Sequence, residues 1–576
     1  MGVKKQYLSD HNICNHSPGY IIAMSTKMKN ITLIILFFLP ALFWCTSCSL
    51  NSNLEKVAEQ WRELELQVNS EIDYKNPYTD VDFWVEFYHS GGDTLVRPGF
   101  WDGGNKWKVR FASSADTGEW LWESFSSNTK NDGLNGKQGK ILCKPYSGDN
   151  HIIKHGLLKM SEGKRNVIHA DGTPFLMIGD TPWALPWRGT VESVTEYAKN
   201  REERGFNAAL LMSLQPDQGV DGPRDRTLAE GFDVAFEDLK DGHISHMNIE
   251  YFQYLDSLVN ILVDNGIVPV YQPVFHGFGW KGKGVLGLTV DPGEYARYTQ
   301  YLIARYGAMP AMWLVGADGN GKNNGVAEGG METEKWDSYE QPAGIHYNPF
   351  DDYRTDFMPE ASCFHYNKSF QEANWLDFQW CQTGHSGQHL FHKIERMYDN
   401  LPVKAVANGE PTYEGIREPS NGSGWWQGHE AWSQFLFGGT MGVVYGAGGL
   451  WNWKLTPDEQ GWPDWADSHV SWREAIELPG STYVGYLGKA LNGLDITDIE
   501  KHPELAEGNL CLAKPGEVYI VYLPTGGQVK ISQLSATLKY QWFDPVKGDF
   551  ISDGDVDSEI QVFLSETESP VVLIIK

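Results

Sequence analysis

Cysteine is scarce in this sequence and widely spaced. Seven cysteines occur among 576 residues, and four of them, Cys143, Cys363, Cys381 and Cys511, lie beyond the N-terminal region. None of the four belongs to a CxxC pair, the usual spacing of zinc ligands, so the sequence predicts no zinc site. Export would permit a disulfide, and the sequence leaves open whether Cys363 and Cys381 form one.

Basic residues are also few. Lysine and arginine total 47 against 75 aspartates and glutamates, which gives a formal net charge of -28 at pH 7. A surface of this charge repels phosphate backbones and anionic lipid headgroups. We therefore expect no nucleic-acid partner, and contact with a membrane only through a covalent lipid anchor. Internal repeats and low-complexity tracts are absent as well, which argues against a repeat protein.

The apolar run near the N-terminus is too short for a permanent membrane helix. It extends from Ile31 to Trp44 and contains Pro40, whereas a membrane span needs about 20 apolar residues. Lys27 and Lys29 precede the run, and two small residues lead from it to Cys48. A basic start, an apolar centre and small residues before a cysteine indicate a cleaved signal peptide that ends in a lipobox.

This leader predicts the location of the protein. We expect export, acylation of Cys48, and attachment by that lipid to the bacterial outer membrane, on the periplasmic or cell-surface side. The residues before Met24 show no targeting pattern, so the natural start is expected at Met24 or Met28. The sequence does not determine the oligomeric state.

Tryptophan, in contrast, is abundant, with 23 residues. Exposed indole rings stack on the C–H faces of sugar rings, and the indole N–H can reach a hydroxyl group. Most tryptophans in a folded protein are nevertheless largely buried. The composition therefore indicates either a large aromatic core or a surface that binds carbohydrate.

The length allows about three or four domains at roughly 150 residues each. We expect residues 1–53 to contain the upstream extension, the signal peptide and a polar tether, and residues 54–150 to form a β-sandwich. A (β/α)8 barrel is expected over residues 151–482 and a second β-sandwich over residues 483–576. The predicted fold class is therefore α/β, a TIM barrel flanked by N-terminal and C-terminal β-sandwich domains.

The two flanking regions show the alternating pattern of antiparallel strands. In the first region the pattern covers Phe83 to Tyr88, Trp107 to Phe111 and Gly118 to Glu123, and in the last it covers Glu517 to Leu523, Gln528 to Ile531, Lys539 to Phe543 and Val571 to Ile575. The segments "RPGFWDGGNKWKVRF" (Arg97 to Phe111) and "TGEW" (Thr117 to Trp120) resemble the N-terminal sandwich module found ahead of several bacterial glycosidase barrels.

The central region alternates short apolar runs with longer amphipathic stretches, which is typical of βα units. Eight strands are predicted, over Phe175 to Gly179, Ala208 to Leu214, Ile267 to Val274, Met312 to Val315, Ser362 to His365, Asp377 to Cys381, Val403 to Ala407 and Gly442 to Tyr445. Helices are predicted over Val191 to Arg204, Ile249 to Asn265, Gly293 to Tyr306 and Gly387 to Tyr398. The segment from Gly319 to Glu360 is predicted to be a long loop. Eight strands are the number in a TIM barrel.

Polar or aromatic residues follow each predicted barrel strand, at the ends that form the active-site face of a TIM barrel. In chain order they are Asp180 with Trp183 and Trp187, Gln215, His276, Asp318, His365, Gln382 with His385, Glu410, and Trp451. All except Asp318 and Glu410 are candidates for binding substrate. Trp425 and Trp426, in a Gly- and Ser-rich segment, are added to these candidates.

Asp318 and Glu410 are the candidate catalytic pair. Glycoside hydrolysis requires two carboxyl groups that flank the scissile bond, and these two follow predicted strands that face each other across the barrel mouth. The alternative for Asp318 is a turn in which the side chain caps a helix. For Glu410 the main rival is Glu414, four residues on. Pro411 stiffens the chain directly after Glu410.

Three histidines, His276, His365 and His385, are predicted on the same face. They could suggest a metal, but the sequence contains no HxH or HExxH pair to support one. Neutral imidazoles also form hydrogen bonds with hydroxyl groups. We therefore expect no metal and no cofactor.

Five segments together resemble the apiosidase-like family of bacterial barrel glycosidases. They are "GDTPWALPWRG" (Gly179 to Gly189), "RGFNAALL" (Arg204 to Leu211), "MWLVGADGNG" (Met312 to Gly321), "FQWCQTGH" (Phe378 to His385) and "NGEPTYE" (Asn408 to Glu414). The resemblance implies that Asp318 is the acid/base and Glu410 the nucleophile. It also implies a C-terminal module similar to one described as a collagen-binding domain. The usual Gly-Gly-Asp of the family reads Gly316-Ala317-Asp318 here.

These observations predict a retaining glycoside hydrolase that acts on a plant or algal cell-wall polysaccharide or its oligosaccharides. The alternative is a non-catalytic surface protein that binds glycan or collagen through its sandwiches, with the barrel as a scaffold. The sugar, the linkage and the choice between exo and endo action are not determined by the sequence.

Overall fold

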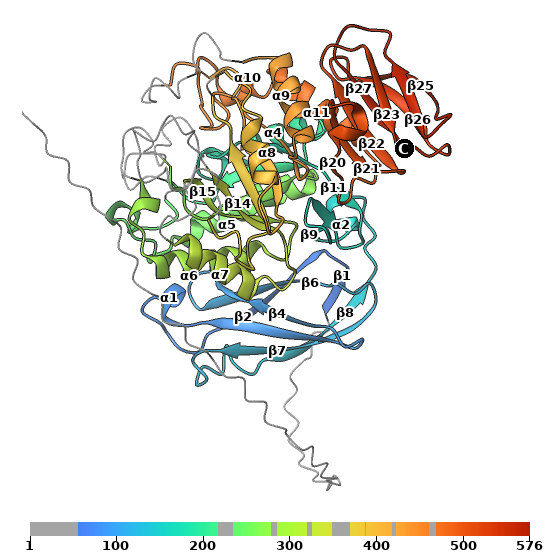
Figure 1. The fold of residues 1–576 in the computed structure, drawn as a ribbon. Helices are drawn as coiled ribbons and strands as arrows, with labels where there is room; N and C mark the ends of the chain where they lie inside the picture. Colours follow the sequence, from blue (N-terminus) through green and yellow to red (C-terminus); the bar gives the residue numbers. More distant parts are fainter. Residues whose placement is uncertain are drawn as a thin grey trace, which may run out of the picture. The chain divides into compact units, whose positions relative to one another are not determined.

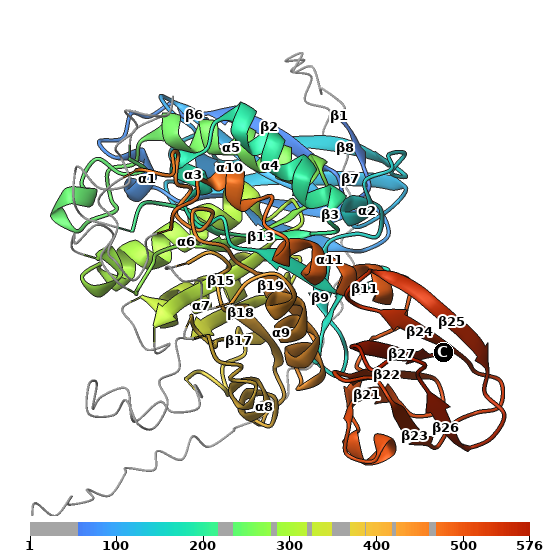
Figure 2. The same ribbon diagram turned by 90° about the horizontal axis from the view of Figure 1, so that it is seen from above.

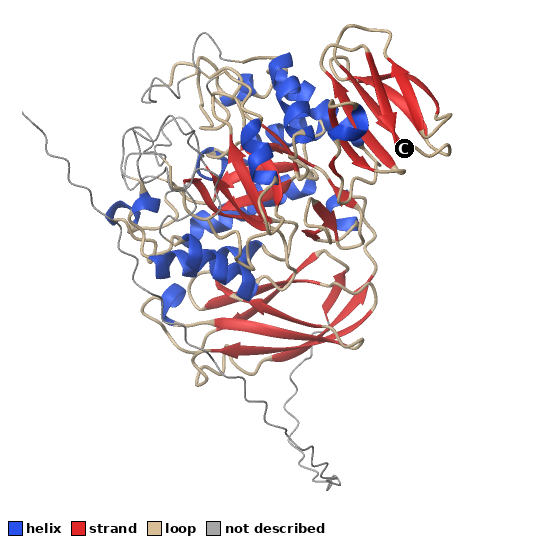
Figure 3. Ribbon diagram, viewed as in Figure 1, coloured by secondary structure: helices blue, strands red, loops and turns tan. Residues whose placement is uncertain are grey.

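The computed structural model describes residues 56–216, 234–277, 285–319, 325–347, 369–385, 387–416, 422–459 and 468–576. The predicted signal peptide, Cys48, Cys363 and His365 lie outside these residues. Strands dominate the first and last parts of the described chain, and most helices belong to the central part (Figures 1 and 3). Within the described ranges, no helix is long and apolar enough to cross a membrane.

The N-terminal module consists of two sheets. The larger contains β1 (Lys56–Glu59), β8 (Gln138–Lys144), β7 (Gly118–Ser126), β3 (Phe83–His89) and β4 (Thr94–Pro98), in that spatial order. The smaller contains β2 (Glu63–Asn69), β6 (Lys106–Ala112) and β5 (Phe100–Trp101). Phe87 and Phe111 stack between the sheets with ring centroids 4.3 Å apart. The alternation of buried and half-buried residues along β3 produces this core, so the predicted sandwich is confirmed.

A small antiparallel sheet leads into the barrel. The short helix α2 (His151–Lys154) precedes β9 (Leu158–Met160), β10 (Val167–His169) and β11 (Pro174–Phe175). The first barrel strand begins two residues later, at Met177.

Eight parallel strands close the central barrel. They are β12 (Met177–Asp180), β13 (Ala208–Met212), β14 (Val268–Gln272), β15 (Met312–Gly319), β16 (Ala343–Tyr347), β17 (Phe378–Gln382), β18 (Ala405–Glu410) and β19 (Gly442–Tyr445). Their residues are almost all buried, because helices cover the outside of a TIM barrel and side chains fill its inside. The predicted TIM barrel is confirmed.

Local sequence signals account for the barrel helices. Thr190 caps α4 (Val191–Glu203) through a capping box, and Asp291 caps α6 (Pro292–Tyr306), which has Pro292 in its first turn. These helices and α5 (Ile249–Asp264) match their predicted ranges closely. The helix α8 (His392–Tyr398) begins later than the predicted Gly387. The reason is that Gly387 has φ +71°, which is outside the right-handed helical region.

The predicted position of the fifth strand was wrong. We predicted Ser362 to His365, but β16 is Ala343–Tyr347, within the segment predicted to be a loop, and it pairs with both β15 and β17. The helix α7 (Val326–Trp336) also lies in that segment. The strand escaped prediction because its five residues, AGIHY, begin with two poor strand formers and include a histidine. Fully buried parallel strands also lack a diagnostic alternation.

The barrel ends in α11 (Gly480–Leu491), so the predicted domain boundary after residue 482 falls inside a helix. This helix lies beside α9 (Trp425–Leu436) in both views (Figures 1 and 2). Its apolar side chains join the barrel core, because Val484, Leu487 and Leu491 recur at helical spacing and are buried.

The C-terminal module is again all β. A six-stranded sheet contains β20 (Glu500–Lys501), β21 (Leu510–Lys514), β22 (Val518–Leu523), β27 (Val571–Ile575), β24 (Lys539–Asp544) and β25 (Asp549–Asp555). It is accompanied by the pair β23 (Gln528–Ser532) and β26 (Ile560–Leu564). The four predicted strands of this region are confirmed. The resemblance of the module to a collagen-binding domain stays a prediction.

The segment Arg97 to Phe111 joins the N-terminal module to the barrel. Arg97 donates a hydrogen bond to the carbonyl of Ile303 at 2.9 Å. Arg110 donates to the carbonyl of Arg305 at 2.6 Å and forms an ion pair with Asp256 at 2.6 Å. Buried arginines require such partners, because an unpaired buried charge is strongly destabilising. The sequence motif of this module is therefore explained largely by its attachment to α5 and α6.

Candidate active site

Asp318 and Glu410 line one pocket at the carboxyl ends of the barrel strands. Its lining includes Trp183, Gln272, Asp318, His346, Glu410 and Trp451. The lining residues come from the ends of β13, β14, β15, β16 and β18 and from the segments that follow β12, β14 and β19. This is the face on which TIM-barrel enzymes carry their active sites. The predicted pair therefore shares one cavity.

Asp318 is held in an unusual backbone conformation. It has φ +53°, in the left-handed region, and the pairing of β15 with β16 shifts register on either side of Ala317. Non-glycine residues in this region cost energy and cluster at functional sites. A side-chain Cβ at Gly277 would lie 1.9 Å from Asp318 Oδ2. Glycine at this position therefore leaves the space that the Asp318 carboxyl group occupies.

Glu410 ends β18 and has three polar neighbours. His385 Nε2 lies 3.1 Å from Glu410 Oε1, and His346 Nε2 lies 3.6 Å from Glu410 Oε2. Tyr413 donates a hydrogen bond to the same carboxylate. Burial by itself raises the pKa of Glu410, but these hydrogen bonds and nearby imidazoles outweigh it and hold the pKa below the ordinary value of 4.5. Glu410 is therefore an anion at neutral pH.

The partners of His385 determine which of its ring nitrogens carries the proton. The backbone N–H of Tyr413 donates to His385 Nδ1 at 3.2 Å, so Nδ1 is the acceptor and Nε2 carries the hydrogen that faces Glu410. Trp183 Nε1 donates to the Tyr413 hydroxyl group at 2.9 Å, which leaves the phenolic hydrogen for Glu410. Both donors to the carboxylate are thus oriented by a further hydrogen bond.

The backbone around Glu410 is also fixed. Asn408 Oδ1 accepts hydrogen bonds from the backbone N–H of Glu410 at 3.2 Å and from that of Thr383 at 3.3 Å. Asn408 Nδ2 donates to the Thr383 hydroxyl group at 2.7 Å. The side chain of Asn408 therefore ties the end of β18 to the segment that follows β17. Such support holds the reacting group in position before the substrate binds. The group therefore loses little conformational freedom during each reaction cycle.

His346 is a site residue that the sequence interpretation missed. It lies on β16, is 1% exposed, and stacks on Trp183 with ring centroids 6.0 Å apart. Burial lowers the pKa of His346 to about 4, so the ring is neutral at pH 7. The charge of Glu410 is then stabilised mainly by the donors His385 and Tyr413. A correct position for the fifth strand would have revealed His346, because His346 is the polar residue near that strand's end.

Two buried polar groups of the pocket lack partners within the described chain. Neither ring nitrogen of His346 has a hydrogen-bond partner there. The same holds for Gln272 Oε1, although Gln272 Nε2 donates to the carbonyl of Val274 at 3.3 Å. An unsatisfied buried polar atom is costly. A bound molecule with several hydroxyl groups would satisfy these atoms.

Glu414, the rival of Glu410, has a structural role. Its carboxylate is fully buried and accepts four hydrogen bonds, from Ser423 Oγ at 2.8 Å, Gly424 N at 2.6 Å, Tyr445 Oη at 2.7 Å and Gly480 N at 2.8 Å. It does not belong to the described lining of the pocket. A carboxylate whose lone pairs are all occupied in this way joins segments of the chain and is not available for a substrate.

Asp180 and Trp187 are corrected from substrate contacts to core residues. Asp180 is fully buried, with Arg201 Nε 2.5 Å and the Tyr197 hydroxyl group 3.0 Å from its Oδ2. This pairing compensates the charge of both groups inside the barrel wall. Trp187 is 0% exposed and packs in the core from the short helix α3 (Leu185–Arg188). Neither residue lines the pocket.

Trp425 and Trp426 begin α9 and pack against neighbouring aromatic rings. Trp425 meets Tyr483 edge-on, with ring centroids 5.6 Å apart, and Trp426 stacks on His389 at 3.8 Å. Each ring is only half-buried, so the predicted role of Trp425 and Trp426 in substrate binding stays a prediction.

Three other predicted residues lie at strand ends outside the described lining. Gln215 is buried and accepts a hydrogen bond from the backbone N–H of Ala235 at 3.1 Å. His276 is 3% exposed and stacks on Tyr295. Gln382 ends β17 and is 9% exposed. In the described ranges, no group of three His, Cys, Asp or Glu side chains could hold a metal ion.

Two protein-family models match parts of this chain. Residues 161–498 match the family described as the apiosidase-like catalytic domain, and residues 57–127 match a domain of unknown function, DUF5060. No curated protein matches the chain.

Solved structures share the fold at low sequence identity. A chain described as a glycoside hydrolase is 19% identical, with 73% of this chain and 97% of the other covered and a TM-score of 0.56. A family 5 glycoside hydrolase from Bacteroides vulgatus ATCC 8482 is 20% identical, with 73% of this chain and 94% of the other covered and a TM-score of 0.55. A further chain of that organism, described as a glycoside hydrolase without a family, is 17% identical, with 91% of this chain and 100% of the other covered and a TM-score of 0.64. Because the family match spans more than half of the sequence and includes Asp318 and Glu410, the chain belongs to the apiosidase-like family of glycoside hydrolases.

Proposed function

We propose that this enzyme is a retaining glycoside hydrolase that acts on a plant or algal cell-wall polysaccharide or on oligosaccharides derived from it. The observation that carries the proposal is that Asp318 and Glu410 line one pocket and that oriented donors keep Glu410 ionised. A retaining mechanism needs one carboxylate that attacks as an anion and a second group that delivers a proton.

The proposed reaction proceeds in two steps. In the first, a Glu410 oxygen bonds to the anomeric carbon while the bond to the leaving oxygen breaks, and Asp318 protonates that oxygen. In the second, Asp318 takes a proton from water, the water oxygen bonds to the anomeric carbon, and the bond to Glu410 breaks. Two inversions at one carbon retain the configuration. This mechanism requires carboxyl groups about 5 to 5.5 Å apart, whereas inversion requires about 6.5 to 9.5 Å.

The remaining pocket residues support a sugar ligand. Trp183 and Trp451 provide aromatic surface for the apolar face of a sugar ring. His346 and Gln272 have buried polar atoms that sugar hydroxyl groups would satisfy. We assign these four residues to substrate binding. The alternative of a non-catalytic glycan- or collagen-binding protein is less well supported, because the chain belongs to a catalytic family and retains both carboxyl groups.

A screen of cell-wall polysaccharides tests the proposed function. Purified enzyme is incubated with pectin, arabinogalactan, xylan and algal polysaccharides, and new reducing ends are measured. We expect release of sugar from at least one of them, and the first anomer formed, followed by proton NMR, should have the configuration of the substrate. An inverted first anomer would contradict the retaining mechanism. Hydrolysis of none of the polysaccharides would contradict the substrate class.

We further propose that the enzyme is anchored to the outer membrane by a lipid on Cys48. The variant Cys48→Ser lacks the thiol that carries the lipid, so it should move from the membrane fraction to the soluble fraction. Activity in solution should be unchanged, because the anchor precedes every described domain. Cell fractionation with immunoblotting measures the distribution. A Cys45→Ser variant is the matched control, and persistent membrane association of Cys48→Ser would refute the anchor.

A further inference from the structure

One large side chain of the segment Arg97 to Phe111 packs against the cores of both the N-terminal module and the barrel and still keeps part of its surface exposed. Arg97 and Arg110 bind barrel carbonyl groups, and Phe100 is 1% exposed and packs against Tyr301 of α6. Trp101, in contrast, is only half-buried. Its indole Nε1 donates to the carbonyl of Gly104 at 2.9 Å, which orients the ring. An oriented and partly exposed indole is the form in which tryptophan binds ligands.

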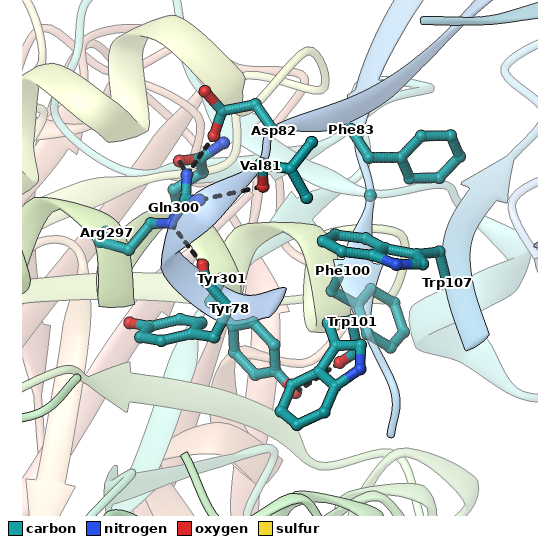
Figure 4. Close-up of a pocket in the computed structure, with 11 residues that line it drawn as sticks. Tyr78, Val81, Asp82, Phe83, Phe100, Trp101, Trp107, Arg297, Gln300 and Tyr301 are labelled. Carbon is teal, nitrogen blue, oxygen red and sulfur yellow. Dashed lines mark hydrogen bonds and ion pairs between the residues drawn. The ribbon is translucent and has the colours of Figure 1, made fainter. Parts of the chain in front are cut away.

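Trp101 lines two hollows where the module meets the barrel. The larger, of about 400 Å³, is bounded by the turn from Asp102 to Lys106 and by the first residues of α5. The smaller has room for about 20 Å³ and is lined mainly by aromatic rings, among them Tyr78, Phe100 and Trp107 (Figure 4). Ligand sites often occur between domains and have volumes of about 300 to 1,000 Å³. The larger hollow falls in this range, whereas the smaller one is too small for a sugar ring.

The larger hollow combines that ring with polar side chains that have no partner. Asn105, Lys106 and Glu250 line it, and their exposed side chains form no hydrogen bond or ion pair with another described residue. Together they offer an amide, an ammonium group and a carboxylate, and therefore both donors and acceptors. In the smaller hollow the charges are already satisfied, because Arg297 pairs with Asp82 and donates to the carbonyl of Val81 at 3.1 Å (Figure 4).

We propose that this junction is a second carbohydrate-binding site, separate from the catalytic pocket, that holds a glycan chain against Trp101. A ligand with many hydroxyl groups fits a hollow that presents both signs of charge beside an apolar ring. No residue of the junction lines the catalytic pocket. The proposal rests on the proposed function only for the choice of carbohydrate as ligand.

Binding at the junction would keep the enzyme on its substrate. A glycan held by a second site raises the effective concentration of its neighbouring segments at the catalytic pocket. The gain applies to long chains and not to short oligosaccharides that cannot reach both sites. The junction is therefore expected to affect activity on polysaccharide and to leave activity on short substrates unchanged.

Native affinity electrophoresis tests the proposal. The full chain and its variants run in gels that contain pectin, arabinogalactan, xylan or an algal polysaccharide. The wild-type enzyme should be retarded by at least one of them, and Trp101→Ala should bind that polysaccharide about tenfold more weakly, because a central tryptophan commonly dominates a binding site. Trp122→Ala, a half-buried tryptophan of the same module outside both hollows, is the matched control and should be retarded like the wild type.

A second variant guards against a folding defect. Asn105→Ala combined with Glu250→Ala removes exposed side chains only, so it should fold normally and still lose retardation. Equal retardation of this variant and the wild type would overturn the proposal, and so would a wild-type enzyme that no polysaccharide retards. Retardation does not require hydrolysis, so its loss in Trp101→Ala supports the site even if no polysaccharide is cleaved. If the enzyme hydrolyses a polysaccharide and both variants bind that polysaccharide like the wild type, the second site is refuted and the proposed function is not.

Discussion

Replacing Glu410 with alanine is expected to abolish hydrolysis of every substrate, with a fall in kcat of about 10⁴-fold or more. The carboxylate is the group that would form the covalent bond to the anomeric carbon, and no other ionised carboxylate in the described lining can take its place once Asp318 serves as the acid. Azide should restore activity, because it fits the space left by the side chain. It attacks the substrate directly, so the glycosyl azide should have inverted configuration.

Glu414→Ala is the matched control, since it removes the neighbouring carboxylate. This change leaves four buried donors without an acceptor and should lower the free energy of unfolding by roughly 4 kcal/mol or more. Urea denaturation of the two variants should therefore separate them, with a large loss of stability for Glu414→Ala and little for Glu410→Ala. If Glu410→Ala kept near-native rates while a folded Glu414→Ala lost them, the nucleophile would be Glu414.

The environment of Glu410 also sets the acid limb of the pH profile. A nucleophile acts as an anion, and the pKa of Glu410 lies below the ordinary carboxyl value of 4.5. The carboxylate therefore stays ionised as the pH falls to that value, and the acid-side loss of kcat/KM caused by Glu410 should lie below pH 4.5. An acid limb near pH 6 would contradict this assignment.

Replacing Asp318 with alanine is expected to slow hydrolysis of natural glycosides by about 10²- to 10⁴-fold. The loss depends on the leaving group, because Asp318 supplies the proton that a poor leaving group needs. Aryl glycosides with acidic phenols leave without that proton, so Asp318→Ala should form the glycosyl–enzyme intermediate on them almost as fast as the wild type. A pre-steady-state burst of phenol measures this step.

Azide distinguishes the two carboxylates in the same assay. In Asp318→Ala it attacks the glycosyl–enzyme intermediate, so the glycosyl azide should retain the configuration of the substrate. Asp318→Asn is the matched control, because it keeps the size of the side chain and removes only its acid function. An equal loss on all leaving groups, or an inverted azide product, would show that Asp318 is not the acid/base.

Much of the barrel could be predicted from local patterns. The last strand, Gly442–Tyr445, was predicted at its observed bounds, and α4 to within one residue, because a capping residue and helical spacing are properties of a short segment. Asp318 and Glu410 were found in the same way, as polar residues directly after apolar runs. In a closed parallel barrel such residues lie on one face.

The environment of each carboxyl group could not be predicted in that way. Asp180, Glu410 and Glu414 each follow a barrel strand, and nothing in their immediate sequence separates them. Asp180 is paired with Arg201, and Glu414 accepts hydrogen bonds from Tyr445 and Gly480. These partners lie 21 to 66 residues away along the chain, and hydrophobic periodicity carries no information about them.

The sequence by itself determined the order of the modules, the TIM barrel and the two residues that chemistry requires, because apolar spacing and strand-end position are local. Only the tertiary structure decided that Glu410 is the available anion, that Glu414 and Asp180 are structural, and that His346 belongs to the site. The physical reason is that burial and hydrogen-bond partners control the charge and accessibility of a side chain. Both arise only when segments distant in the sequence pack together.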